Sequence, residues 1–334
     1  TADATEITDA SEPVTWGTAG TTTWYVVKGE DVQLSQGAVC VGDVRLILAD
    51  GAKLTATGEN DHPGIKVSGD GNSLTIYGQA NQSGEDSAAG IGGENSQDGS
   101  NINICGGVVT AIGGYDAAGI GGGNGADGYN ITIYGGVVTA TGGDGAAGIG
   151  GGSGQDGSNI NIYGGVVTAK GGFFGAGIGG GYEGSGSNIT INGGEVTATG
   201  GENAAGIGGG WGDFGSNISI NGGVVTATGG NNGASIGSGH EGPASSNIYV
   251  ATNLVVKAGS AANPTTVITN TGADLASNLA DKQYATVEPK PVPHKSDHFV
   301  DATSGLRFEV TAVGEANTVK VTDNNYTGTS YTVP

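Results

Sequence analysis

The sequence predicts an all-β parallel solenoid, and two repeated features predict it. A block that reads GGVVTA, or GGEVTA in one copy, begins at positions 29 residues apart, which are Gly106, Gly135, Gly164, Gly193 and Gly222. Isoleucines follow the same step in two further blocks, one reading AGIG and the other NINI, NITI or NISI. Self-similarity at a fixed period of this length is typical of proteins whose repeats stack on one another and share one core.

Each repeat contains three short segments of strand character, which are NITIY, VVTAT and AAGIG in the copy that starts at Asn130. Glycine-rich turns separate them, and no segment shows the apolar spacing of a helix. Ile131 and Ile133 alternate with polar residues, so we expect both to face the core. Charged residues in other copies of the second segment mark its outward positions, which leaves Val196 and Ala198 facing inward. One repeat therefore predicts one coil of three strands.

The repeat weakens toward both ends, and this predicts the division of the chain. About eight coils follow from the loose and strict copies together, and the segment ADLASNLADKQYA is expected to close the far end as a short helix or a loop. The C-terminal tail is expected to dock on the solenoid, to begin a further module, or to pair with another chain. The predicted parts are a flexible leader and cap at 1–23, a parallel β-helix at 24–285, a Pro- and Lys-containing linker at 286–297, and a small β tail at 298–334.

Composition excludes some partners. The 334 residues carry a formal net charge of -21, which argues against nucleic acid as a partner. No apolar stretch is long enough to cross a bilayer, so we expect no membrane insertion.

The two cysteines are expected to be free thiols. Cys40 and Cys105 fall in different coils, and a disulfide needs closely spaced Cα atoms.

Three motifs carry a resemblance to a known family: LILADGAKLTATG from Leu46, SLTIYGQ from Ser73, and the tandem AAGIGGG and NITIYGGVVTATGG. In combination they resemble a Gly-rich repeat family exported by gut-type Firmicutes and Actinobacteria, whose members are often labelled carbohydrate-binding. The resemblance spans roughly residues 24–260 and implies a right-handed parallel β-helix that is secreted or held at the cell surface. It also implies a glycan or a host or cell-surface protein as partner. It supplies no catalytic motif.

One corner of the coil changes from polar to aromatic along the chain. Asparagine and serine in the early copies give way to Tyr182, Trp211 and His240, with Phe214 nearby. Large rings on exposed glycine-rich corners form a candidate ligand-binding patch for a sugar or a protein partner. The alternative is that the tail or the closing segment packs over them.

The same corner carries a column of aspartates in the early coils, Asp98, Asp127 and Asp156. The segments GGNGADG and GGSGQDG fit the GGxGxD pattern of calcium-binding β-helix repeats, which makes calcium a candidate cofactor. In those repeats, however, the pattern recurs every nine residues, whereas here it occurs once per coil. The alternative is a solvated aspartate at each turn.

The sequence favours a non-enzymatic surface protein for adhesion or glycan binding, with two alternatives. The first is a subunit of an extracellular filament, in which the partner is another copy of the chain. The second is a polysaccharide lyase or glycosidase, because cleavage of a sugar chain needs convergent carboxylates or a basic residue in a groove. The acidic region that would supply them consists of Glu59, Asp61, His62, Glu85, Asp86 and Glu94.

Overall fold

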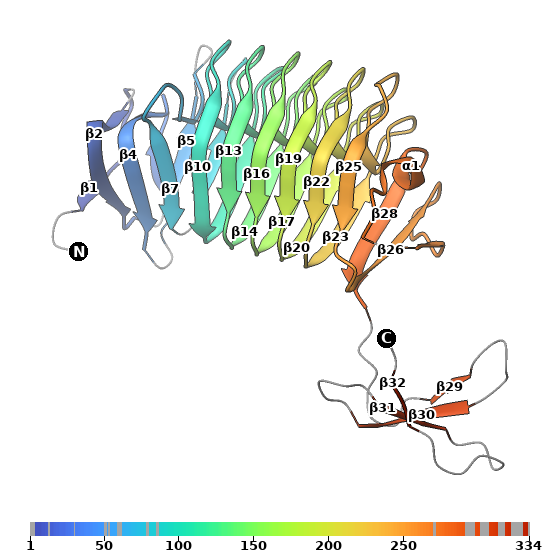
Figure 1. Cartoon of the computed structure of the whole chain (residues 1–334). Coiled ribbons are helices and arrows are strands. Elements are labelled where there is room, and N and C mark those ends of the chain that lie inside the picture. Colours follow the sequence, from blue (N-terminus) through green and yellow to red (C-terminus); the bar gives the residue numbers. More distant parts are fainter. Residues whose placement is uncertain are drawn as a thin grey trace. The chain divides into compact units, whose positions relative to one another are not determined.

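The computed structural model has two compact units, Thr1–Pro289 and Lys290–Pro334, and the first is a parallel β-solenoid of about 7 turns (Figure 1). Its repeats confirm the predicted fold class. The structure describes residues 4–12, 14–29, 31–49, 52, 54–58, 62–77, 80–84, 87–269 and 272–290, and beyond these the strands 298–300, 307–312, 318–321 and 330–332.

Each complete turn contributes one strand to each of three faces. The first face holds the longest strands: β2 (Val14–Val27), β4 (Ala38–Leu48), β7 (Ser73–Tyr77), β10 (Gly99–Gly106), β13 (Gly128–Ile133), β16 (Gly157–Ile162), β19 (Gly186–Ile191), β22 (Gly215–Ile220) and β25 (Ser246–Val250). The second face holds β3 (Val32–Leu34), β5 (Leu54–Thr57), β8 (Ala80–Ser83), β11 (Val108–Ile112), β14 (Val137–Thr141), β17 (Val166–Lys170), β20 (Glu195–Thr199) and β23 (Val224–Thr228). The third face holds two-residue strands: β6 (Ile65–Lys66), β9 (Ile91–Gly92), β12 (Ile120–Gly121), β15 (Ile149–Gly150), β18 (Ile178–Gly179), β21 (Ile207–Gly208) and β24 (Ile236–Gly237).

Equivalent residues of successive turns pair in parallel register on all three faces, as Ile131 does with Ile160. Like therefore stacks on like, and columns of Ile, Val and Ala fill the interior. Ile131, Ile133, Val196 and Ala198 are all buried, as predicted. Because the strict repeats contribute the same side chains at equivalent positions, and the earlier turns contribute other apolar ones, the core is continuous along the solenoid.

Asparagines shape the corner before the first face. Asn101, Asn130 and Asn159 have φ angles of 57°, 54° and 52°, a left-handed conformation that Asn tolerates better than most residues. Their amides also connect successive turns, since Asn130 Nδ2 donates to Asn101 Oδ1 at 3.3 Å and Asn217 Nδ2 donates to Asn188 Oδ1 at 3.2 Å. These corners thus bend sharply, and each of the two amide hydrogen bonds joins one turn to the next.

The N-terminal end differs from the prediction. Residues 1–23 were expected to form a flexible leader and cap, but β1 (Thr5–Ile7) pairs in parallel with β2, and β2 itself begins at Val14. The predicted boundary at residue 24 is therefore wrong and falls inside a strand. The alternating pattern of this coil is weaker than that of the strict repeats, which is why the sequence did not reveal its start.

The C-terminal end is closed by a reversal of chain direction. β28 (Tyr284–Pro289) pairs antiparallel with β23 and with β26 (Leu254–Gly259), and β27 (Val267–Ile268) pairs antiparallel with β26. Of the two predicted forms of the closing segment, a short helix or a loop, the structure has the helix α1 (Ala276–Leu279), with Ala276 and Leu279 buried. This reversal replaces the expected eighth coil, and it places residues 286–289 of the predicted linker within a strand.

The second unit contains four antiparallel strands, β29 (His298–Val300), β30 (Arg307–Ala312), β31 (Thr318–Val321) and β32 (Ser330–Thr332). The predicted linker from residue 291 onward lies outside the described residues. Whether the tail docks, is truncated or pairs with another chain stays a prediction.

Both cysteines are free thiols, as predicted. Within the described residues, no helix has the length and apolar character needed to cross a membrane.

Candidate functional site

The third face is so narrow that it brings two corner loops together along one edge of the solenoid. β18 has only two residues, and the loop before it carries Phe173 and Phe174 while the loop after it carries Tyr182. Trp211 occupies the position of Tyr182 in the next turn, and its backbone N–H donates to the carbonyl oxygen of Phe174 at 2.9 Å. We call the side chains of Phe173, Phe174, Tyr182 and Trp211 the aromatic ridge.

The rings of the ridge contact one another directly. Tyr182 and Trp211 are stacked, with ring centroids 5.1 Å apart and an angle of 13° between their planes. Phe174 stands nearly perpendicular to both, at centroid distances of 5.5 Å from Tyr182 and 6.3 Å from Trp211. Phe173 meets Phe174 edge to face at 4.6 Å and is 43% exposed. The rung spacing of ~4.8 Å holds the stacked pair at this separation.

The ridge contains only part of the predicted contact patch. Tyr182 and Trp211 come together as expected, but in the described part of the chain no ring contact joins Phe214 or His240 to them. Phe174, which contacts both rings, was not among the four predicted contact residues. Its signal was present, because two consecutive phenylalanines between glycines are unusual at an exposed corner.

The aspartate column connects successive turns through backbone hydrogen bonds. Asp98 Oδ1 accepts the N–H of Asp127 at 3.0 Å, Asp127 Oδ1 accepts that of Asp156 at 3.0 Å, and Asp156 Oδ1 accepts that of Ser185 at 2.8 Å. Burial, followed by the charges of Asp98 and Asp156, raises the pKa of Asp127 despite its hydrogen bond from Asp156. Among the described residues, no group of three or more His, Cys, Asp or Glu side chains is placed to hold a metal ion. Calcium binding stays a prediction.

We expect Asp127→Asn to stabilise the protein at pH 7 by on the order of 0.5 kcal/mol, since a partly exposed like-charge contact is removed. The amide oxygen can still accept the Asp156 N–H. Because the folded pKa of Asp127 lies above its unfolded value, the folded state holds the proton more tightly and this group's contribution to stability falls as pH rises. The higher stability of Asp127→Asn should therefore disappear below about pH 4, where the Asp127 carboxyl of the parent is protonated in both the folded and the unfolded state.

Urea unfolding of both proteins at pH 7 and pH 3.5, in EGTA, measures this difference. Asp70→Asn is the control, because Asp70 is exposed and lies outside the column. A less stable Asp127→Asn protein in EGTA would contradict the repulsion argument. Repeating the pH 7 series with calcium chloride tests the metal, since a bound ion should stabilise the parent more than the variant.

The acidic first coils are only partly described. Glu59, Asp61, Glu85 and Asp86 lie outside the described residues. Glu94 contacts His62 through Oε1 and lies 2.5 Å from Lys66 Nζ through Oε2. Burial raises the pKa of Glu94, but hydrogen bonds and charges from Lys66 and His62 outweigh it and hold that pKa below its usual range.

A sugar-cleaving acid needs the opposite shift, toward a raised pKa. The cavity beside Glu94, His62 and Lys66 has a volume of about 50 Å³, which is room for one or two water molecules rather than a sugar ring. The described part of this region is arranged as an ion-paired cluster.

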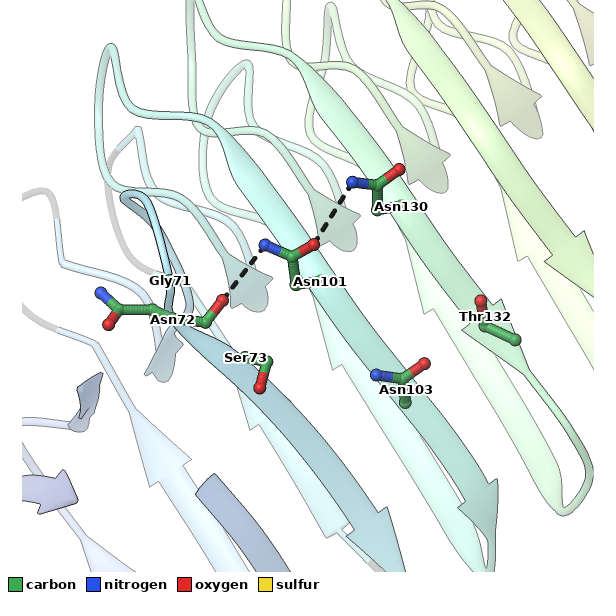
Figure 2. Close-up of a pocket in the computed structure, with 7 residues that line it drawn as sticks. All are labelled: Gly71, Asn72, Ser73, Asn101, Asn103, Asn130 and Thr132. Atoms are coloured by element: carbon green, nitrogen blue, oxygen red, sulfur yellow. Dashed lines mark hydrogen bonds between the residues drawn. The ribbon is translucent and has the colours of Figure 1, made fainter. Parts of the chain in front are cut away.

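A groove on the first face was not predicted. It has a volume of about 460 Å³ and spans the coils of β7, β10 and β13 (Figure 2). Its lining residues are all uncharged: Gly71, Asn72, Ser73, Asn101, Asn103, Asn130 and Thr132. Asn101 Nδ2 donates to the carbonyl oxygen of Asn72 at 3.2 Å and, with Asn130, forms part of the corner ladder. We call this surface the amide groove.

Comparison with known proteins supports the repeat architecture. Five segments match a family model described as a beta helix repeat, at residues 102–124, 131–153, 160–182, 189–211 and 218–240. Each segment runs from a first-face strand through the second face to the short third strand and the corner after it. These five segments are therefore similar to beta-helix repeats. Curated proteins and solved structures gave no significant match.

Proposed function

We propose that this chain is a non-catalytic adhesion protein, secreted or held at the bacterial cell surface, which binds a protein partner through the aromatic ridge. The observation that carries the proposal is the contact between Phe174, Tyr182 and Trp211 on a corner where earlier turns carry Asn124 and Ser153. Clustered apolar side chains on the surface of a soluble domain mark interaction sites. β-Helices occur in enzymes and in non-enzymes, so the proposal depends on the ridge and not on the fold.

The ring geometry favours a protein over a sugar at this position. A sugar stacks its C–H groups on the broad face of an aromatic ring. Tyr182 and Trp211 each cover one face of the other, and Phe174 stands across both. The result is a compact, half-buried apolar cluster with Phe173 exposed beside it. Such a cluster fits an apolar pocket on a protein, where buried aromatic anchors supply much of the binding free energy.

Carboxylates surround the ridge and indicate the chemistry of the partner. Asp144 and Glu202 are exposed and occupy the position of Phe173 in the turns before and after it, and Glu183 is exposed next to Tyr182. An apolar centre with a charged rim is the usual anatomy of a protein interface. We therefore expect a partner whose apolar pocket has a basic rim, and binding whose association rate falls as salt is raised.

We expect Trp211→Ala to weaken binding of the full chain to epithelial cells about thirtyfold, since loss of an aromatic anchor typically costs about 2 kcal/mol. Flow cytometry with the fluorescent chain measures the binding curve. Protease treatment of the cells should abolish binding, and glycosidase treatment should leave it intact.

Tyr115→Ala is the matched control. Tyr115 occupies the position of Phe173 two turns earlier and is 65% exposed, but in the described chain it makes no ring contact. If Tyr115→Ala and Trp211→Ala weaken binding equally, or if neither does, the ridge is not the contact surface. Thermal unfolding of each variant shows whether the fold is intact.

A further inference from the structure

We propose that Tyr134 and Tyr163 form an oxidative cross-linking site, at which hydrogen peroxide and a haem peroxidase join two successive turns of the solenoid by a carbon–carbon bond between the two rings. Both residues come directly after strands of the first face, since β13 ends at Ile133 and β16 ends at Ile162. They share no residue with the aromatic ridge. The inference goes beyond the proposed protein adhesion and does not depend on it.

The rings of Tyr134 and Tyr163 already contact each other in the folded chain. Their centroids are 5.4 Å apart and the angle between their planes is 9°. In the part of the chain that the structure describes, no other two tyrosine rings are in contact. Dityrosine forms when two phenoxyl radicals meet through the ring carbons next to their hydroxyl groups. A stacked pair therefore holds the reacting carbons close together before oxidation begins.

The backbone keeps the two tyrosines at equivalent positions of neighbouring turns. Tyr134 N–H donates to the carbonyl oxygen of Ile104 at 2.8 Å, and Tyr163 N–H donates to that of Ile133 at 2.8 Å. Ile133 and Ile162, the residues before the two tyrosines, pair in parallel register. Because the turns hold this register, the effective concentration of one ring beside the other far exceeds the concentration of a second protein molecule in dilute solution. Coupling within one chain is therefore favoured over coupling between chains.

Both rings are open to an oxidant from solution. The side chains of Tyr134 and Tyr163 are 52% and 50% exposed. Exposed side chains reorient within picoseconds to nanoseconds, so the rings can turn from the stacked geometry into the one that forms the bond. The pair thus combines close contact with access and freedom to move.

The neighbours of the pair in the same column favour oxidation of the tyrosines. One turn before Tyr134 the position holds Cys105, and burial raises the pKa of its thiol. The thiolate, which is the readily oxidised form of cysteine, is therefore scarce at neutral pH. One turn after Tyr163 the position holds Asn192, which has no aromatic ring to couple with. The coupling partners within this column are therefore Tyr134 and Tyr163.

The reaction consumes one hydrogen peroxide for each cross-link. The peroxidase removes one electron and one proton from each phenol O–H group, which gives two phenoxyl radicals and reduces the peroxide to two water molecules. The radicals couple through one ring carbon next to each hydroxyl, and the hydrogens on these carbons move to the oxygens as both rings regain aromaticity. The product has a new carbon–carbon bond, both hydroxyl groups and two fewer hydrogen atoms. The bond closes a loop of one turn and so restricts the unfolded chain as a disulfide does.

The experiment treats the full chain at micromolar concentration and pH 7 with hydrogen peroxide and a haem peroxidase, and records dityrosine fluorescence. We expect fluorescence on a chain that still migrates as a monomer in denaturing electrophoresis. Mass spectrometry of a digest should find the peptides of Tyr134 and Tyr163 joined, with a combined mass lower by two hydrogen atoms. Tyr134→Phe removes only the hydroxyl group and should lower the fluorescence at least about fivefold, because coupling must then occur between less favourably placed rings.

Tyr115→Phe is the matched control. Tyr115 is 65% exposed, more than either member of the pair, but it makes no ring contact in the described chain, so its loss should leave the fluorescence unchanged. The proposal is overturned if no joined peptide contains Tyr134 and Tyr163, if the two phenylalanine variants lower the fluorescence alike, or if the parent carries dityrosine only in covalent dimers. Trp211→Ala should cross-link as the parent does while losing cell binding, so failure of this proposal leaves the test of protein adhesion intact.

Discussion

Gly150→Ala should destabilise the solenoid by about 4 kcal/mol or more, or prevent its folding, because two independent costs coincide at one residue. Gly150 ends the two-residue strand β15 with a φ of +135°, which side-chain-bearing residues rarely adopt. A Cβ at this position would also overlap the carbonyl oxygen of Gly179 in the next turn. That oxygen accepts the N–H of Gly151 at 2.9 Å, so it cannot move away without breaking a bond between turns.

The variant Gly154→Ala separates the conformational cost of a positive φ from the steric cost of a Cβ that overlaps the next turn. Gly154 also has a positive φ, +80°, but a Cβ there would meet nothing within 4 Å. Only the conformational cost of about 1–2 kcal/mol should appear. Urea unfolding followed by far-ultraviolet circular dichroism measures both variants. Equal losses of stability in the two variants would show that the close approach of successive turns is not what requires glycine at Gly150.

The interior could be predicted from sequence because two periodicities agree there. Alternation within a strand assigns Ile131 and Ile133 to the core, and the 29-residue step repeats the assignment in every turn. Charged residues in single copies then identified the outward positions of the second segment. Because several turns give the same assignment of inward and outward positions, the copies support one another.

The ends and the binding surfaces could not be predicted in the same way. The antiparallel closure by β26 and β28 occurs once, so no second copy marks its register. Phe174 joins the ridge because a two-residue strand brings its loop against the loop that follows the strand. This contact depends on proximity in space, which the separation of the residues in the sequence does not reveal.

Asp274→Ala should have the second large effect, because this carboxylate closes the open edge of the last parallel strand on the first face. Asp274 accepts the backbone N–H groups of Asn247 and Ile248 at 2.8 Å each and that of Ala276 at 3.0 Å. Leu275 N–H donates to the carbonyl oxygen of Ile248 at 2.8 Å. Hydrogen bonds to a charged group contribute about 1.5–3 kcal/mol each, so their loss should cost about 3 kcal/mol after water replaces some of them.

The same bonds predict how the contribution of Asp274 depends on pH. Burial raises the pKa of Asp274, but the hydrogen bonds from Ala276, Ile248 and Asn247 outweigh it and hold that pKa below its ordinary value. The stabilisation is therefore fully present above the unfolded pKa of about 3.9 and is lost as pH falls through the folded pKa. The stability difference between parent and Asp274→Ala should narrow on acidification below pH 4, the opposite sign to that expected for Asp127.

Opening this edge should also change the assembly state. Unpaired N–H and C=O groups on a strand edge template pairing with another chain, and Asp274 with Leu275 covers those of Asn247 and Ile248 in β25. At the other end, Asp9 Oδ1 accepts the N–H of Gln33 at 2.9 Å, and Ala10 forms a bridge to Leu34. Both ends thus place an aspartate and a short backbone contact against an edge strand. At these two strands, the arrangement opposes pairing with another chain.

Sedimentation velocity at increasing concentration should accordingly show the parent as a monomer and Asp274→Ala as a growing series of oligomers. Asp281→Ala is the control, since Asp281 is exposed at the same end of the solenoid. If the parent itself forms fibres that persist when residues 298–334 are deleted, the ends stack despite their caps and the filament alternative is favoured. If fibres require those residues, assembly runs through the tail strands, and the aspartate caps would serve to exclude stacking through the ends.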